Sequence, residues 1–528
     1  MGNRLFVIQV ALIVALGGFL MGFDASVISG VNEFIKPEFN LTELQLGWAV
    51  ASLTLVASLA MLAAGPLSDA IGRKSMLRIA AALYAISAIG SALAPSYNLL
   101  LVARMIGGLG LGASLIIAPM YIAEISPPKM RGQMVSFNQL NIVLGISTAF
   151  FSNYLILKLG QSDASWLQSL GFGQYQWRWM LGLEALPAVL YFVGLFLVPR
   201  SPRWLIMQGE YEAALTIMKK ANGPQKAEEE MDKIQEGLKK DDGGEKSSFS
   251  DLVGPGMLTV LLIGVVIAIL QQITGINSVF FYAPMIFKQA GLGIDAAFSQ
   301  AIWVGMINLV FTVLAIMFVD RLGRKPLLSF GVAGIAVFMM LLAYGFNQAT
   351  YSLTDDGLQT EAVANLELDV ALAPLVGQTY NSDLEFRAAI SDALEKNNSG
   401  EKSEEAIGAL LPVVTNLNAT LILIGILGFV ACFAISIGPV MWVLFSELFP
   451  NHIRGLMISA VGFLNSMVSF VVQLVFPWEL SNLGSSTTFM IYGIFAVLGL
   501  VFILWKVPET KGKSLEELEV MLGTARKR

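Results

Sequence analysis

Long apolar stretches alternate with short polar loops along almost the whole chain. Stretches of about 18 or more apolar residues are long enough to cross a bilayer as helices. Twelve such windows fall at residues 5–30, 46–69, 76–94, 98–123, 134–157, 179–198, 257–287, 298–319, 327–346, 419–446, 456–477 and 486–506. The pattern therefore predicts an all-α membrane protein with twelve spans.

Basic residues are concentrated in every second loop, and this asymmetry predicts the orientation. Loops rich in Lys and Arg tend to remain on the cytoplasmic side. We therefore expect both termini to be cytoplasmic. The basic residues of these loops are Arg73, Lys74, Arg78, Lys129, Arg131, Arg321, Arg324, Lys325 and Arg454, followed by the terminal RKR.

Two longer polar segments interrupt the series of windows. Residues 199–256 contain EYEAALTIMKKA and KAEEEMDKIQEGLKK, which have the pattern of amphipathic helices, so they predict a cytoplasmic helical linker. Residues 347–417 contain twelve acidic and three basic residues and are expected on the opposite side. This insertion is interpreted as solvated and partly helical, the alternative being a cap that collects substrate or binds a partner. The expected division is a bundle at 1–198, the linker at 199–256, and a bundle at 257–528 that includes the insertion at 347–417 and a short cytoplasmic tail.

Three loop signatures occur twice, in the same order. DAIGRK after the second window matches DRLGRK after the eighth, YIAEISPPKMRG matches LFSELFPNHIRG, and VPRSPRW matches VPETKG. The repeat predicts two pseudo-symmetric six-helix bundles, the major facilitator fold, with a substrate site near mid-membrane between them. Acids and arginines at helix ends suit a latch that holds the cytoplasmic face closed. The expected latch residues are Asp69, Arg73, Glu124, Arg131, Asp320, Arg324, Glu447 and Arg454.

These motifs resemble those of the sugar porter family, which includes facilitative glucose transporters and bacterial sugar/proton symporters. The resemblance rests on GRK in both halves, RGQMVSFNQ, PRSPRW, QQITGIN and PETKG, and it extends from Val10 to Leu518 apart from the insertion. Arg200 of PRSPRW stands where the family usually has Glu. We expect this exchange to weaken the latch unless Glu210 or Glu212 replaces the missing acid.

Neutral amides interrupt several spans and suggest a sugar site. In QQITGIN, Gln271, Gln272 and Asn277 must face the bundle interior, because lipid offers no hydrogen-bonding partner. Amides donate and accept hydrogen bonds, as the hydroxyls of a sugar require. Bonding between helices is the structural alternative for any single amide. The resemblance implies that sugar is bound by Gln139, Gln271, Gln272, Asn277, Asn308, Trp442 and Asn465, while Phe281 and Ser466 depart from the family pattern and leave the choice of sugar open.

Asp24 is the only ionisable residue between Leu5 and Asn32, inside the first window. Arg104 in the fourth window lies at a matching depth, so the two side chains are expected to pair. One interpretation is a structural ion pair; the other is that Asp24 carries a proton, released while Arg104 is close and taken up when the pair separates. Bacterial symporters of the family have Asp, Arg and Glu at the positions of Asp24, Arg104 and Glu184. The resemblance therefore implies that Asp24 is a proton carrier, Arg104 its modulator and Glu184 a relay.

Composition excludes several other classes of protein. The chain is 55% hydrophobic and 14% charged, and it has one cysteine, Cys432, and one histidine, His452. A disulfide framework, a metal site, a catalytic triad, a nucleic-acid partner and a cofactor are therefore not expected, and no obligate protein partner is indicated. The sequence predicts import of a monosaccharide with a proton across a bacterial plasma membrane. The alternatives are a sugar uniporter, a sugar sensor and a drug/proton antiporter.

Overall fold

The computed structural model describes residues 4–128, 130–242, 257–360, 366, 368–397, 399–450, 453–513, 517, 518 and 521. Within these residues, twelve helical segments are long and apolar enough to cross a membrane, which confirms the twelve predicted spans. Nine spans each lie within one helix, and three consist of two helices with a break between them. The uninterrupted spans are α1 (Arg4–Glu38), α2 (Glu43–Ile71), α3 (Arg73–Ala92), α4 (Tyr97–Ile125), α5 (Arg131–Gly160), α14 (Ile294–Leu322), α15 (Arg324–Asn347), α23 (Arg454–Asn482) and α24 (Gly484–Lys506).

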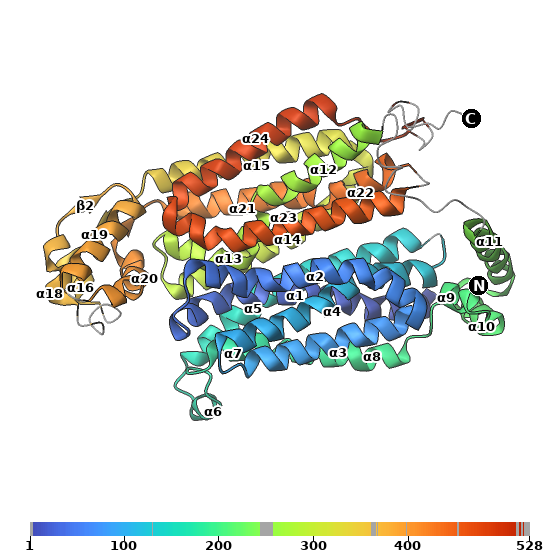
Figure 1. Ribbon diagram of the computed structural model, residues 1–528, viewed down its shortest axis with the longest axis horizontal. Helices are drawn as coiled ribbons and strands as arrows, with labels where there is room; N and C mark the ends of the chain where they lie inside the picture. Colours follow the sequence, from blue (N-terminus) through green and yellow to red (C-terminus); the bar gives the residue numbers. More distant parts are fainter. Residues whose placement is uncertain are drawn as a thin grey trace.

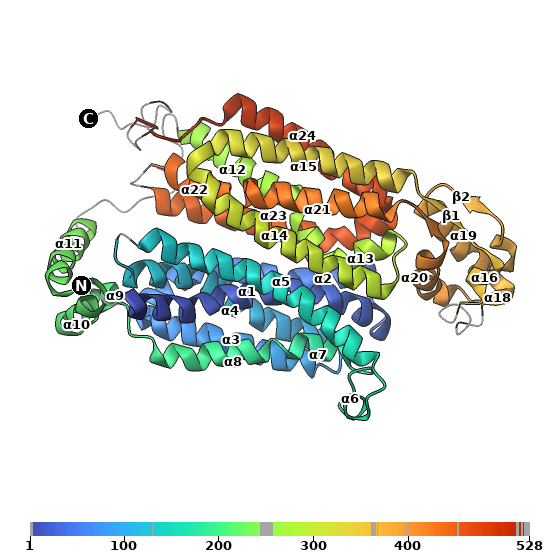
Figure 2. The same cartoon turned by 180° about the vertical axis from the view of Figure 1, so that it is seen from behind.

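The first six spans form one bundle, made of α1 to α5 with α7 (Gln176–Gly182) and α8 (Ala185–Leu197), and the last six form the other (Figures 1 and 2). The second bundle is made of α12 (Met257–Ile273), α13 (Ile276–Gln289), α14, α15, α21 (Ala419–Ile435), α22 (Ile437–Leu448), α23 and α24. In the first bundle α1 packs against α5 and α2 against α4, and in the second α15 packs against α24 and α21. The bundles meet where α1 contacts α13, α2 contacts α23 and α5 contacts α14. This arrangement is the major facilitator fold that the repeated loop signatures predict.

Each interrupted span consists of two helices. The sixth span is α7 (Gln176–Gly182) and α8 (Ala185–Leu197), the seventh is α12 (Met257–Ile273) and α13 (Ile276–Gln289), and the tenth is α21 (Ala419–Ile435) and α22 (Ile437–Leu448). QQITGIN predicts the break in the seventh span, where Gly275 has a φ of 88°, a left-handed conformation that glycine adopts at little cost. The apolar windows did not predict the breaks at Glu184 and Ser436.

Two glycines allow α1 and α5 to pack closely. A Cβ atom on Gly22 would collide with the carbonyl oxygen of Ile142 on α5. A Cβ atom on Gly145 of α5 would lie 2.9 Å from the backbone nitrogen of Phe23 on α1. Since lipid provides no hydrophobic drive for helix association, such close backbone packing is a main source of cohesion in a bundle.

One end of the molecule carries the linker helices, and we call it the linker end. These helices are α9 (Pro202–Met207), α10 (Tyr211–Asn222) and α11 (Pro224–Asp242), and Figure 1 shows them on the same side as the start of α1 and the end of α24. Met218 of α10 is buried against Leu205 of α9 in a small apolar core. The two amphipathic helices predicted in the linker are therefore confirmed.

The opposite end carries the acidic insertion, and we call it the insertion end. The insertion contains α16 (Asp355–Leu358), α18 (Asp369–Leu372), α19 (Asp383–Lys396), α20 (Ser403–Val414) and 3₁₀ turns at Ala373–Leu375 and Gly400–Lys402. An antiparallel sheet joins β1 (Thr350–Ser352) to β2 (Thr379–Tyr380) and β3 (Thr415–Asn416) in the order β2-β1-β3.

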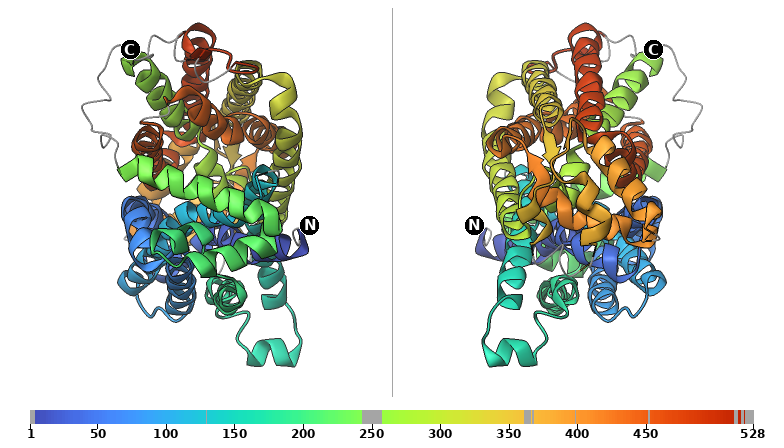
Figure 3. Two further views of the ribbon diagram at one scale, coloured as in Figure 1. Left: turned by 90° about the vertical axis from the view of Figure 1, so that its right-hand side faces the viewer. Right: turned by 90° about the vertical axis from the view of Figure 1, so that its left-hand side faces the viewer.

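The insertion is a compact unit that is docked on the second bundle. Phe386 and Leu410 are fully buried in its own apolar core. Helices α19 and α20 contact α24 and α13, and Figure 3 (right) looks onto this end of the molecule. The expectation of a solvated, partly helical segment was therefore incomplete, because the insertion also has a sheet and a core.

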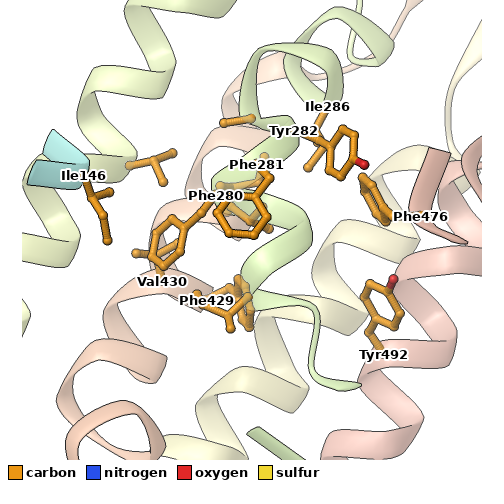
Figure 4. Packing of buried hydrophobic residues seen from close by; sticks show 14 of the residues in the cluster. Ile146, Phe280, Phe281, Tyr282, Ile286, Phe429, Val430, Phe476 and Tyr492 are labelled. Carbon is orange, nitrogen blue, oxygen red and sulfur yellow. The ribbon is translucent and has the colours of Figure 1, made fainter. Parts of the chain in front are cut away.

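Apolar side chains fill the junction of the bundles toward the insertion end. Figure 4 shows Phe280, Phe281 and Tyr282 of α13 among aromatic and aliphatic side chains. Ile146 of the first bundle belongs to the same cluster as Phe281, and both are 8% exposed. The two bundles thus share one apolar core in this region.

Candidate functional site

Four of the seven amide and aromatic residues predicted to bind sugar are joined by hydrogen bonds. The Nε2 atom of Gln272 donates to Oδ1 of Asn465 at 3.0 Å, and Nδ2 of Asn277 donates to Oε1 of Gln272 at 2.8 Å. Asn465 in turn donates to Oε1 of Gln271 at 2.8 Å. We call these four residues the amide cluster; Gln271, Gln272 and Asn465 are 5–7% exposed.

The breaks in the seventh and tenth spans meet at the amide cluster. The turn at Gly275 places Gln271 and Gln272 before the break and Asn277 after it. Gln271 donates to the backbone oxygens of Ile437 and Gly438, which follow the break at Ser436. Broken helices of this kind expose backbone and side-chain polar groups at membrane depth, where substrate sites are built.

A chain of hydrogen bonds runs from the amide cluster to the first bundle. Asn277 donates to Oγ of Ser469 at 2.6 Å, and Nε2 of Gln473 donates to the same oxygen at 2.7 Å. Thr54 of α2 then donates to Oε1 of Gln473 at 2.9 Å. Ser469, Gln473 and Thr54 were not predicted from the sequence, although Gln473 is an amide in an apolar span and could have been recognised by that signal.

The other three predicted sugar-binding residues lie apart from this network. Gln139 is exposed on α5, because the neighbouring Asn138 is the residue that packs against Gly18 of α1. Trp442 on α22 is 42% exposed, and Asn308 on α14 is 4% exposed. Among the described residues, these three side chains therefore share no hydrogen bond with the amide cluster in this conformation.

Asp24 and Arg104 form the predicted pair. The Nη1 atom of Arg104 lies 3.4 Å from Oδ1 of Asp24, and both side chains are 2% exposed. The Nε atom of Arg104 also donates to the backbone oxygen of Ala49 at 2.8 Å, which fixes the guanidinium between α1, α2 and α4. The second carboxylate oxygen of Asp24 has no hydrogen-bond partner among the described residues.

Glu184 joins this pair electrostatically. It lies at the break between α7 and α8, it is 2% exposed, and it is close enough to interact with the charges of Asp24 and Arg104. Its Oε1 atom likewise has no partner in the described part of the chain. The first bundle therefore buries two carboxyl groups beside one guanidinium, and a proton on either carboxyl balances their charge.

Five of the eight predicted latch residues form ion pairs within their own bundle at the linker end. Arg73 lies 2.6 Å from Asp69 and 3.3 Å from Glu124, and Arg324 lies 2.7 Å from Glu447. These pairs stay within one bundle, so they order the helix ends of that bundle in this conformation.

Two further arginines of the predicted latch have other partners. Arg131 lies 3.6 Å from Glu230 of the linker helix α11, and Nε of Arg454 donates to the backbone oxygen of Phe449 at 3.0 Å. The side chain of Asp320 lies outside the described residues.

Hydrogen bonds and ion pairs between the bundles gather at the insertion end. They connect α1, α2 and α5 with α13, α14 and α23, from the middle of these helices toward the insertion end. The pairs include Asn32 with the Phe281 oxygen at 2.9 Å, Glu33 with Lys288 at 2.6 Å, Thr54 with Gln473 at 2.9 Å, Ser147 with the Gly305 oxygen at 2.9 Å, and both Lys158 and Gln161 with Asp295 at 2.8 Å. These contacts hold the two bundles together in this half of the molecule.

Comparisons with known proteins identify sugar transporters as relatives of this chain. The sequence profile of a family described as "Sugar (and other) transporter" matches residues 10–360 and 406–522. An arabinose-proton symporter of Bacillus subtilis (strain 168) is 34% identical over 514 residues, which cover 97% of this chain and 94% of the relative. A D-xylose-proton symporter of Escherichia coli (strain K12) is 35% identical over 98% of this chain and 96% of its own length.

The structure of this chain is also similar to solved structures of a xylose transporter, XylE from E. coli. A partially occluded inward open conformation matches with a TM-score of 0.72 and 32% identity, covering 96% of this chain and 99% of that one. A structure of this proton:xylose symporter bound to 6-bromo-6-deoxy-D-glucose matches with a TM-score of 0.68 and 33% identity, covering 98% and 100% of the two chains.

Proposed function

Because the chain belongs to the sugar transporter family, we propose that it is a secondary active transporter that imports a monosaccharide together with a proton by alternating access. The buried amide cluster carries this proposal. Its members donate and accept hydrogen bonds within the second bundle, and a chain of hydrogen bonds connects them to Thr54 of the first, so they offer the partners that an uncharged polyol requires. The proposed sugar-binding residues are Gln139, Gln271, Gln272, Asn277, Asn308, Trp442 and Asn465.

We propose that Asp24 carries the proton, with Arg104 as its modulator and Glu184 as a relay. Two buried carboxyl groups beside one guanidinium leave one negative charge unbalanced when both are ionised, and the buried site disfavours that state. A protonated Asp24 no longer binds Arg104 strongly. Proton uptake then loosens the contact of α1 with α4, which is a movement within the bundle that alternating access can use.

The linker end is proposed to face the cytoplasm of a bacterial cell, with both termini on that side. The contacts at the insertion end keep the opposite face closed, and the similarity to a partially occluded inward open conformation of a relative, with a TM-score of 0.72, supports an inward-facing conformation. In the outward-facing conformation, the proposed latch would bring the linker ends of the bundles together. Its residues are Asp69, Arg73, Glu124, Arg131, Asp320, Arg324, Glu447 and Arg454.

Uptake of labelled sugars into proteoliposomes tests the proposed function. A panel of pentoses and hexoses is offered with and without an inward proton gradient. We expect at least one sugar to accumulate above its external concentration only when the gradient is present. Equilibration without accumulation would identify a uniporter, and failure of every sugar to move would contradict the assignment of the amide cluster.

The bond from Thr54 to Gln473 is expected to favour closure of the insertion end. Thr54→Val keeps the shape of the side chain but removes the donor, at a cost to the closed state of about 0.5–1.5 kcal/mol. The population open at the insertion end should rise by roughly two- to tenfold. Distances between spin labels near the insertion ends of α2 and α23 would measure the shift. Thr54→Ser restores the hydroxyl and should restore closure; if both variants open equally, the hydroxyl is not what holds this end closed.

A further inference from the structure

The repeated loop signatures build nearly the same structure at the linker end of each bundle. Gly72 before α3 has a φ of 92°, and Gly323 before α15 has a φ of 93°. Arg73 and Arg324 follow these glycines and pair with Glu124 and Glu447. The two helix starts therefore have the same local geometry.

Further contacts extend the correspondence. The Nζ atom of Lys74 donates to the backbone oxygen of Phe196 at 3.2 Å, and that of Lys325 donates to the oxygen of Leu504 at 3.0 Å. Ser201 donates to the carboxylate of Glu124, and Thr510 donates to that of Glu447. The segment Pro199-Arg200-Ser201 of the first bundle thus occupies the place of Pro508-Glu509-Thr510 in the second.

The two bundles differ in the charge of the middle residue of this segment. In the second bundle, the carboxylate of Glu509 accepts from the backbone nitrogens of Arg324 and Lys325 at 3.1 Å each, so it caps α15. In the first bundle the corresponding residue is Arg200, which has no acceptor to offer. Gly72 gives α3 no side-chain cap.

A cavity of about 270 Å³ lies at this uncapped helix start. Its walls include Lys74, Ser75, Arg78, Arg200 and Trp204. Lys74 and Arg78 form no ion pair with an acidic residue of the described chain, and Nε of Arg78 is buried without a hydrogen-bond partner. Arg200 lies 3.5 Å from Glu210, but both side chains are about half exposed, and such pairs contribute little.

We propose that this cavity binds the phosphate group of an anionic ligand, which takes the place that the Glu509 carboxylate occupies in the second bundle. The helix start donates backbone N–H groups, and Lys74, Arg78 and Arg200 supply the positive charge. The same phosphate chemistry is offered by an anionic phospholipid headgroup and by a soluble phosphate. Its position at the linker end, beside span ends, places the cavity within reach of both.

Thermal unfolding of the purified protein in detergent provides the first test. Inorganic phosphate is compared with chloride at equal ionic strength, and phosphatidylglycerol is compared with phosphatidylcholine. We expect phosphate, phosphatidylglycerol or both to raise the midpoint of unfolding, and the responding probe identifies the source of the phosphate group. A protein that responds to neither probe would overturn the proposal.

Two variants distinguish binding in this cavity from nonspecific attraction of anions to the positively charged surface. Arg200→Glu supplies the missing carboxylate. We expect it to raise the probe concentration that gives half of the shift in the unfolding midpoint by about tenfold or more. Arg203→Glu makes the same charge change at an exposed position of α9 that does not line the cavity, and it should leave the response unchanged. Equal loss in both variants would show that net charge, not this cavity, attracts the anion.

Arg200→Glu should also fold without the added probe, because its carboxylate can accept from the start of α3 as Glu509 accepts from the start of α15. Its midpoint without phosphate should equal or exceed that of the unaltered protein. A lower midpoint, together with a retained response to the probe, would contradict the correspondence between Arg200 and Glu509.

Discussion

Asp24→Asn is expected to abolish accumulation of sugar while sugar exchange across the membrane continues. Asparagine has nearly the same shape and can still accept a hydrogen bond from Arg104, but it cannot bind and release a proton. With one proton per sugar, a gradient of one pH unit supports at most about tenfold accumulation. We expect the ratio of internal to external sugar to fall from that range to one in proteoliposomes that contain the variant.

Asp392→Asn is the matched control for this experiment. It makes the same chemical change at an exposed position of α19 in the insertion, far from the buried pair. We expect it to accumulate sugar as the unaltered protein does. If Asp24→Asn also accumulates sugar, Asp24 is a structural partner of Arg104 and another group carries the proton.

Features that depend on position along a span were predictable from the sequence. The distance of Asp24 and Arg104 from their span ends placed them at one depth, and the structure brings them within 3.4 Å. The glycine between Gln272 and Asn277 marked the break in the seventh span, and the structure has it at Gly275. The length of a span, the position of a charged residue along it and the position of a glycine can all be read from one segment without knowledge of its neighbours.

Features that depend on the neighbours of a helix were not predictable in the same way. The bond from Thr54 to Gln473 joins residues 419 positions apart, and it depends on how α2 and α23 are rotated toward each other. Arg131 was expected to belong to a latch formed by residues of the repeated loop signatures. In the structure it lies beside Glu230 of the linker. The cavity lined by Arg200 was not predictable either, because its interpretation requires the geometry of Glu509 in the other bundle for comparison.

Gln272→Leu is expected to weaken sugar binding by about 10- to 100-fold without changing the coupling of sugar to protons. Leucine fills a similar volume but can neither donate nor accept a hydrogen bond. Gln272 donates to Gln271 and Asn465 and accepts from Asn277, so the change removes a central member of the amide cluster. The sugar would meet a site with fewer partners for its hydroxyls, and the loss of two bonds at about 0.5–1.5 kcal/mol each accounts for the expected decrease in affinity.

Equilibrium binding of the transported sugar by calorimetry measures this effect, and the number of protons moved per sugar shows whether coupling survives. Gln348→Leu, at the exposed end of α15, is the control for loss of an amide and should bind sugar normally. Because Asp24 lies in the other bundle, the proton count should remain the same in Gln272→Leu even where affinity has fallen. Unchanged sugar affinity in Gln272→Leu would mean that the amides hold helices together and that the sugar binds elsewhere between the bundles.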